Sequence, residues 1–100
     1  MLLVLWEYHV IPGQADAFEG LYRPDGPWTE LLKKSPGFLS TTLWHDRHDP
    51  FRYLVADRWT SEALYDEFLV QFTAEIATLS ARGMRSWSRE VLLGRFDLLD

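Results

Sequence analysis

The chain has 100 residues, the size of one compact domain, and we expect a single domain over residues 1–100. Its net charge of −5, with Lys and Arg scattered along the sequence, argues against a nucleic-acid partner, whose phosphates require clustered basic residues. The absence of cysteine excludes disulfides, thiolate metal sites and a thiol nucleophile. No segment approaches the roughly twenty apolar residues of a membrane span, so we expect no membrane partner and a cytoplasmic location.

The first half of the chain is predicted to form a strand and two short helices. The β-rich run LLVLWEYHVI predicts a strand over residues 2–11 that ends at a Pro-Gly pair. Apolar residues at helical spacing predict a helix over 14–22 and, after a break, another over 27–35. Pro27 suits the first position of the second helix, where its missing N–H costs nothing.

The second half is predicted to form a hairpin, one long helix and a last strand. Strands over 38–45 and 51–59 flank the turn sequence DRHDP. Ser61 can cap a helix that runs without interruption to Gly83, because apolar residues continue at helical spacing along its length. A strand over 87–96 follows.

The order β-α-β-β-α-β predicts an α+β, ferredoxin-like fold with a four-stranded antiparallel sheet. Right-handed crossovers give the strand order 4-1-3-2 and place the helices on one face. Strand alternation also predicts which residues face the helices. These are Val4, Trp6, Tyr8, Val10, Leu39, Thr41, Leu43, His45, Tyr53, Val55, Asp57 and Trp59.

The other face of the sheet also needs cover, because residues 2–6 are all apolar and residues 53–56 are apolar on both sides of their strand. A second copy of the chain, packed sheet to sheet across a two-fold axis, is the simplest source, so we expect a homodimer. Glu7 is then expected to face the partner and meet an Arg there. The alternative is a sheet with an unusually apolar exposed face.

Aromatic residues are abundant for so small a domain, at 15% of the chain. They are hard to pack without a gap, so we predict an aromatic pocket between helices and sheet for a flat hydrophobic ligand. The predicted substrate-binding residues are Trp6, Trp28, Trp59, Tyr65, Phe68 and Phe72. The alternative reading is that these are ordinary core residues.

His45 is the candidate general base, since an imidazole titrates near neutral pH. The alternative is a polar residue at a strand end. The run HDRHD over 45–49 has neither helical nor strand spacing and reads as a solvated turn, so we expect no metal.

Three stretches of the sequence resemble antibiotic biosynthesis monooxygenase domains. They are VIPG followed by a helix, PGFL through the hairpin to DRWTS at 57–61, and the helix with Tyr65 and Phe68. The resemblance covers essentially the whole chain and implies a dimeric α/β barrel. Members of that family include cofactor-free oxygenases of polyketide anthrones, quinol monooxygenases and haem-degrading oxygenases.

The chain departs from two of those groups. Haem-degrading members use an Asn on the first strand and a Trp and a His on the second helix. By spacing, those positions here are Trp6, Phe68 and Thr78, so the haem ligand is missing and we expect no cofactor. Anthrone oxygenases have Asn, Trp and Arg in the pocket, whereas this chain has no Asn.

Two functions remain open. The first is cofactor-independent oxygenation of a small phenolic, quinol or polyketide-like aromatic, in which the electron-rich substrate reduces O₂ inside a dry pocket. The second is a non-catalytic, small-molecule-binding or stress-associated dimer of the same fold, which the absent Asn and haem ligand favour. Substitution of His45 by Ala should abolish turnover in the first case and only alter affinity in the second.

Overall fold

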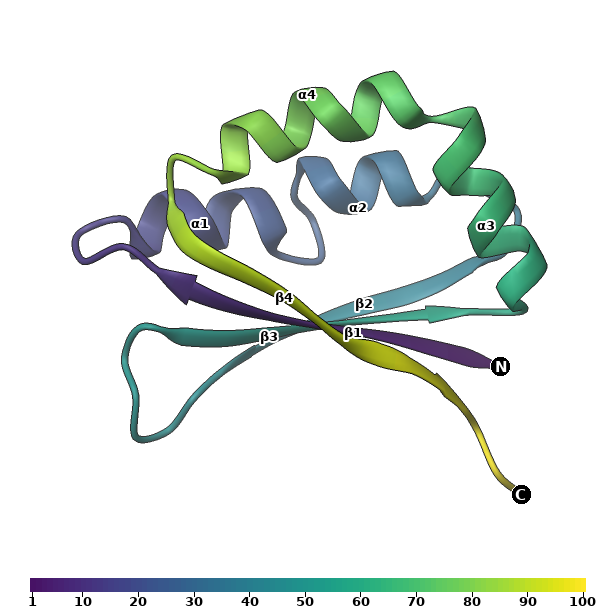
Figure 1. Cartoon of the computed structure of the whole chain (residues 1–100), viewed down its shortest axis with the longest axis horizontal. Helices are drawn as coiled ribbons and strands as arrows, with labels where there is room; N and C mark the ends of the chain where they lie inside the picture. Colours follow the sequence, from purple (N-terminus) through teal and green to yellow (C-terminus); the bar gives the residue numbers. More distant parts are fainter.

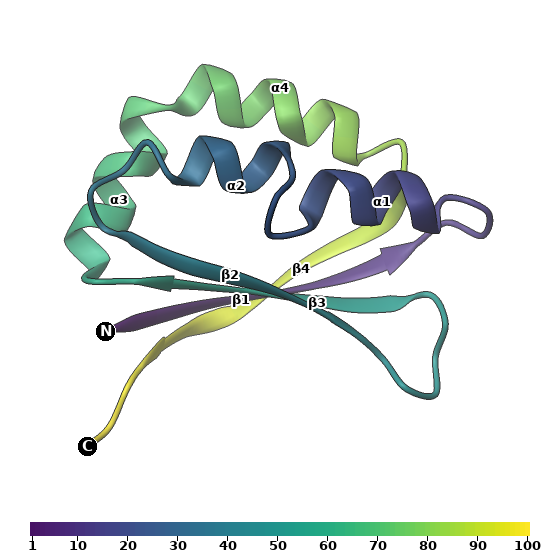
Figure 2. The same cartoon turned by 180° about the vertical axis from the view of Figure 1, so that it is seen from behind.

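A computed structural model describes residues 1–100 and shows eight elements of secondary structure, which follow the predicted order except that the last predicted helix is divided in two. In chain order they are β1 (Leu2–Val10), α1 (Ala15–Tyr22), α2 (Pro27–Leu32), β2 (Phe38–His45), β3 (Arg52–Trp59), α3 (Glu62–Gln71), α4 (Thr73–Gly83) and β4 (Trp87–Asp97). The strands form one antiparallel sheet in the order β2-β3-β1-β4, which confirms the predicted fold class and strand order. All helices lie on one side of the sheet (Figure 1, Figure 2).

The prediction of one uninterrupted helix as far as Gly83 is wrong, because the helix breaks at Phe72. Phe72 leaves helical geometry, with φ −109° and ψ 26°. The Thr73 hydroxyl then donates to the carbonyls of Leu69 and Val70 at 2.8 and 2.9 Å, which satisfies the end of α3. The apolar spacing continues across the break, so the pattern could not reveal it. The break lets α3 descend to the end of the sheet while α4 runs along it (Figure 1).

The predicted inward position of Leu39 is also wrong. The pairing of β2 with β3 shifts register between Phe38 and Ser40, so Leu39 is the extra residue of a bulge. Leu39 is 51% exposed, while Phe38 packs against the core and Thr41 is buried. The other inward predictions on β1 and β3 agree with the structure, since Val4, Tyr8, Val10 and all four β3 residues are buried and Trp6 packs on the core.

The core consists of two hydrophobic clusters on the helix-covered face of the sheet. One contains Leu2, Val4, Leu31, Leu32, Trp59, Tyr65 and Phe68. The other contains Tyr8, Val10, Phe18, Leu21, Tyr22, Tyr53 and Val55. Burial of each large side chain stabilises the fold by about 1.5–3 kcal/mol. Trp6 and Trp28 pack against both clusters and therefore lie where the two meet.

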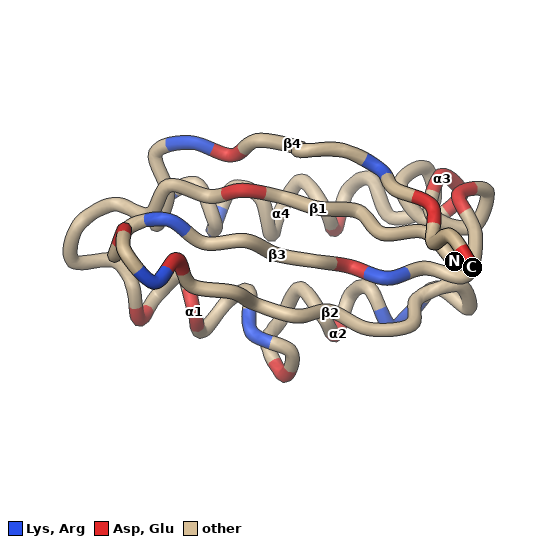
Figure 3. Tube along the Cα trace, turned by 90° about the horizontal axis from the view of Figure 1, so that it is seen from below, with Lys and Arg blue, Asp and Glu red and all other residues tan.

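The second face of the sheet has no helix over it (Figure 3). Strand pairing places Leu3, Leu5, Leu54 and Phe96 on this open face. The longest helix has 11 residues, so no helix of this chain could span a bilayer.

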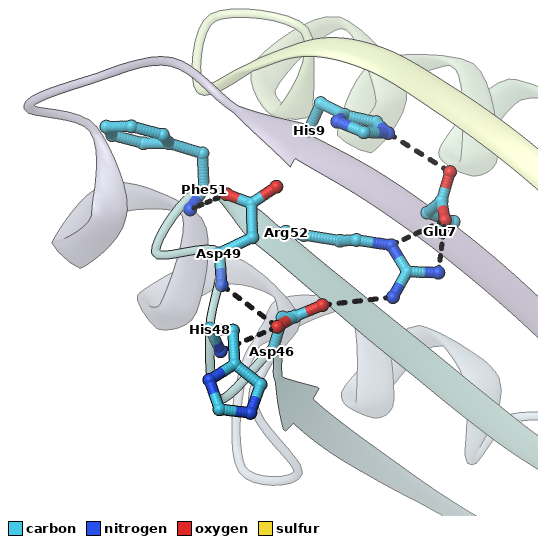
Figure 4. A network of polar contacts seen from close by, with 7 residues as sticks. All are labelled: Glu7, His9, Asp46, His48, Asp49, Phe51 and Arg52. Carbon is cyan, nitrogen blue, oxygen red and sulfur yellow. Dashed lines mark hydrogen bonds and ion pairs between the residues drawn. The ribbon is translucent and has the colours of Figure 1, made fainter.

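A polar network occupies the hairpin end of the open face (Figure 4). The Arg52 guanidinium donates to Glu7 at 2.6–2.7 Å and to Asp46 at 3.1 Å, and His9 lies 3.0 Å from Glu7. Glu7 was expected to meet an Arg of a partner, but Arg52 of its own chain occupies that position. The hydrogen bonds from Arg52 and His9 lower the pKa of Glu7, so this carboxylate is satisfied within the chain.

Candidate functional site

A cavity of about 380 Å³ lies between the helices and the sheet. All eight elements contribute to its walls, and most of the lining residues are hydrophobic. The volume is at the lower end of the range for ligand sites, about 300–1,000 Å³. The cavity lies where the two core clusters meet, because its lining includes members of both.

Four of the six predicted substrate-binding residues line this cavity: Trp6, Trp28, Tyr65 and Phe68. The other two lie outside its lining. Trp59 is fully buried, and its ring packs 5.0 Å from Tyr65 and 5.2 Å from Phe68 between ring centroids. Phe72 packs against Phe68 at 5.3 Å and against the core.

The break between α1 and α2 positions Trp28. Gly26 has backbone carbonyls so close that a Cβ atom would lie 2.8 Å from the oxygen of Gly20, so the chain can turn there only with glycine. Pro27 then starts α2, and Thr29 donates back to the carbonyl of Arg23 at 3.3 Å. Trp28 consequently stacks on Tyr22, with ring centroids 5.9 Å apart, and forms part of the cavity wall.

The floor of the cavity contains a buried carboxylate, Asp57 on β3. Asp57 is 8% exposed, and the hydroxyl of Thr41 on β2 donates to its Oδ1 at 2.6 Å. The two residues meet because Thr41 and Asp57 are paired across neighbouring strands. Burial raises the pKa of Asp57 to about 6, although the Thr41 hydrogen bond acts in the opposite direction.

Two tyrosines provide further polar atoms. Tyr8 donates to Glu90 at 2.6 Å, and the Trp87 indole donates to the hydroxyl of Tyr22 at 3.0 Å. Tyr8, Tyr22 and Glu90 all line the cavity. Burial raises the pKa of both tyrosines, so their hydroxyls remain protonated at neutral pH.

Sequence reasoning missed the contribution of β4. Tyr8, Trp6 and Val4 pair with Glu90, Leu92 and Arg95 respectively, and these three β4 residues line the cavity. Their spacing of two and then three residues reflects a register shift opposite Leu5 and Trp6. Simple alternation would put Glu90 and Arg95 on opposite faces, so only the bulge brings them together.

Arg95 closes one end of the cavity by joining β4 to α3. It donates to Asp66 at 2.9 Å and to Glu62 at 3.2 Å, and its guanidinium lies 4.9 Å from the centre of the Tyr65 ring. These exposed pairs contribute little stability individually, about 0–1 kcal/mol. Their effect is to hold a cation beside the cavity.

His45 is exposed and is not among the residues that line the cavity. Its Nε2 lies 2.9 Å from the carbonyl of Pro50, and its ring stacks on Tyr53 with centroids 4.3 Å apart. Tyr53 in turn donates to Glu19 at 2.5 Å. The role of His45 as a base stays a prediction. No group of three or more His, Asp or Glu side chains is arranged to hold a metal ion.

Solved structures with this fold include an oxygenase. SnoaB, a cofactor-independent oxygenase from Streptomyces nogalater, is 17% identical with a TM-score of 0.78, over 99% of this chain and 93% of that chain. PA3566 from Pseudomonas aeruginosa is 19% identical with a TM-score of 0.71, over 99% and 94%. A structure named antibiotic biosynthesis monooxygenase is 21% identical with a TM-score of 0.65, over 100% of both chains. At these identities the likeness shows a shared fold.

The sequence itself identifies the family. No curated protein sequence matches the chain. The family model for antibiotic biosynthesis monooxygenases, however, matches residues 1–71, which include β1 to β3 and all of α3. This match covers three of the four strands of the sheet, including the pair that carries Thr41 and Asp57, and the helix that carries Tyr65 and Phe68. The chain therefore belongs to the antibiotic biosynthesis monooxygenase family.

Proposed function

We propose that this protein is a cofactor-independent monooxygenase of a small aromatic substrate, a phenol, quinol or polyketide-like compound. The observation that carries the proposal is the apolar, aromatic-walled cavity in a chain of this family. Trp6, Trp28, Tyr65 and Phe68 form flat surfaces suited to a flat ligand. The structural likeness to SnoaB, a cofactor-independent oxygenase, supports the same reaction class.

In this proposal the substrate is the electron donor. Loss of a proton makes the aromatic electron-rich enough to reduce O₂, and apolar walls exclude water from the resulting radical pair. For an anthrone the overall change is the conversion of a ring CH₂ and O₂ to a ring C=O and H₂O. One oxygen atom enters the product, the other leaves as water, and the substrate supplies all the electrons.

Oxygen uptake tests the proposal. The purified protein is incubated under air with anthrones and with hydroquinones. Oxygen uptake is compared with that of the same substrate in buffer without protein. We expect uptake above this background, with the anthraquinone as product from an anthrone and the hydroxylated quinone as product from a hydroquinone. Ser80→Trp, which fills the cavity from α4, should reduce uptake about tenfold or more by excluding the substrate.

Ala81→Trp is the matched control, because Ala81 is the exposed neighbour of Ser80 on the same helix. It should leave uptake unchanged. Uptake that stays at background with every substrate, while the same aromatics bind, would contradict catalysis. That outcome would favour the alternative function, a dimeric small-molecule-binding or stress-associated protein.

We also propose that the protein is a homodimer through its open sheet face. The apolar residues of that face, Leu3, Leu5, Leu54 and Phe96, have no cover within the chain. Packing of two such sheets would remove this surface from water. The helix-covered face, which holds the cavity, would then remain accessible in each subunit.

A further inference from the structure

Asp57 is the one carboxylate buried in the cavity floor. Its Oδ1 accepts the Thr41 hydroxyl at 2.6 Å, which fixes the orientation of the carboxyl group. Its Oδ2 accepts no hydrogen bond from the protein. Oδ2 is also not one of the fully buried polar atoms without a partner, so it remains accessible from the cavity. Since Asp57 lines the cavity, Oδ2 is the oxygen left for a ligand.

No cation neutralises this carboxylate. Arg95 is the one cationic side chain of the cavity lining, and it is held by Asp66 and Glu62 of α3. The other titratable groups of the lining are Glu90 of β4 and the tyrosines of β1, α1 and α3, and none of them forms a hydrogen bond with Asp57. An ionised carboxylate in apolar surroundings is costly unless a donor reaches it, so the free oxygen would bind a hydroxyl strongly.

We propose that Asp57 is the proton acceptor of the reaction, positioned by Thr41, and that the substrate therefore carries an acidic hydroxyl, as a phenol or an enol. This inference rests on the proposed function and names the substrate class of that cavity. The hydroxyl O–H bond breaks, its proton moves to Oδ2, and the electron pair remains on the substrate oxygen. The phenolate or enolate formed is the electron-rich species that reacts with O₂.

Two properties support this assignment over the exposed His45. A base must be within hydrogen-bond reach of the proton that it removes, and Asp57 lines the cavity whereas His45 does not. Burial also raises the pKa of Asp57 to about 6, so the group is ionised at neutral pH yet is a stronger base than an ordinary carboxylate.

Binding of 2-naphthol and of naphthalene tests the inference, because the two probes differ by one hydroxyl and neither has the oxidisable CH₂ of an anthrone. Affinity is measured by calorimetry from about pH 4 to pH 8. Wild-type protein should bind 2-naphthol about tenfold more tightly above pH 6 than at pH 4, because the ionised carboxylate accepts its hydroxyl. Naphthalene affinity should not change over this range.

Asp57→Asn should weaken 2-naphthol binding at pH 7 about tenfold or more and remove its pH dependence, while naphthalene still binds. Asp25→Asn is the matched control, because the Asp25 side chain is 85% exposed and does not line the cavity. Thr41→Val should move the midpoint of the 2-naphthol profile to higher pH, since the Thr41 hydrogen bond lowers the pKa of Asp57. A merely structural role for Thr41 would not shift this midpoint.

The outcomes separate this inference from the proposed function. Equal 2-naphthol affinity in the wild type and Asp57→Asn, with naphthalene bound by both, would overturn the role of Asp57 and leave the aromatic cavity standing. Failure of the wild type to bind either probe would overturn both. Normal 2-naphthol binding through Asp57 without oxygen uptake from anthrones would overturn oxygenation and with it the proton transfer to Asp57, and would leave Asp57 as the group that binds the hydroxyl.

Discussion

Asp57 is a buried carboxyl group, and its ionisation in the folded chain costs stability. A carboxyl whose pKa is higher in the folded chain binds its proton more tightly there than in the unfolded chain. The pKa of Asp57 rises from an ordinary value of 3.8 to about 6, so its ionisation costs stability as pH rises through that window. The cost is fully present above about pH 6 and absent below about pH 4.

Asp57→Asn should therefore be more stable than the wild type at pH 7, by up to about 3 kcal/mol, and equally stable near pH 4. Asn can still accept the Thr41 hydrogen bond, so the packing is kept. Urea denaturation of both proteins at several pH values checks this. A difference between them that does not change from pH 4 to pH 7 would contradict a raised pKa.

At the scale of elements, the space around a glycine decides whether a side chain can replace it, and helix propensity alone does not. Gly83 ends α4, where a Cβ atom would overlap the Tyr22 hydroxyl and lie 3.0 Å from the Trp87 indole nitrogen. Tyr22 and Trp87 are joined by a hydrogen bond between α1 and β4. Gly20, within α1, has no atom within 4 Å of the same position.

Gly83→Ala should destabilise the fold by about 1–3 kcal/mol, because the added methyl pushes Tyr22 away and breaks its bond with Trp87. Gly20→Ala is the matched control and should stabilise the fold by about 0.5–1 kcal/mol through helix propensity alone. Thermal or urea unfolding of the two variants measures both effects. Equal gains in both would mean that the space at Gly83 is less restricted than the structure shows.

The elements themselves could be predicted from the sequence, but their interruptions could not all be. Pro24 and Gly26 predict the break between α1 and α2, because both residue types are unfavourable in the interior of a helix. No such residue marks the break at Phe72, where the apolar spacing continues and the Thr73 hydroxyl bonds the last carbonyls of α3. The bulge at Leu39 was likewise hidden, because alternation along a strand carries no information about an extra residue.

At the scale of the whole molecule, the helices cover one face of the sheet and leave the other open (Figure 1, Figure 3). The cavity lies on the covered face. The polar network around Arg52 occupies the hairpin end of the open face (Figure 4). Beyond it the face carries Leu3, Leu5, Leu54 and Phe96, with Arg58 opposite Leu3. A stable interface between two proteins buries at least about 1,000 Å² in total. The apolar part of the sheet is the surface of this chain best suited to supply it.

Leu5→Glu should convert the proposed dimer to a monomer at micromolar concentration, because it would bury an unpaired carboxylate in the centre of the sheet interface. Val70→Glu is the matched control, since Val70 is 79% exposed on α3 and away from that face. Sedimentation of the three proteins distinguishes the cases. A wild-type chain that sediments as a monomer would contradict the dimer outright.

The sequence by itself determined the order of elements, the order of strands and the one-sided placement of helices, because spacing, turn residues and crossover handedness are local properties. It also placed Trp6, Thr41 and Asp57 on the helix-covered face. Only the tertiary structure decided that Thr41 meets Asp57, that a β4 bulge adds Glu90 and Arg95 to the cavity, and that His45 lies outside it. Those relations depend on register between strands distant in the chain, and one extra residue in a strand changes which side chains face the cavity.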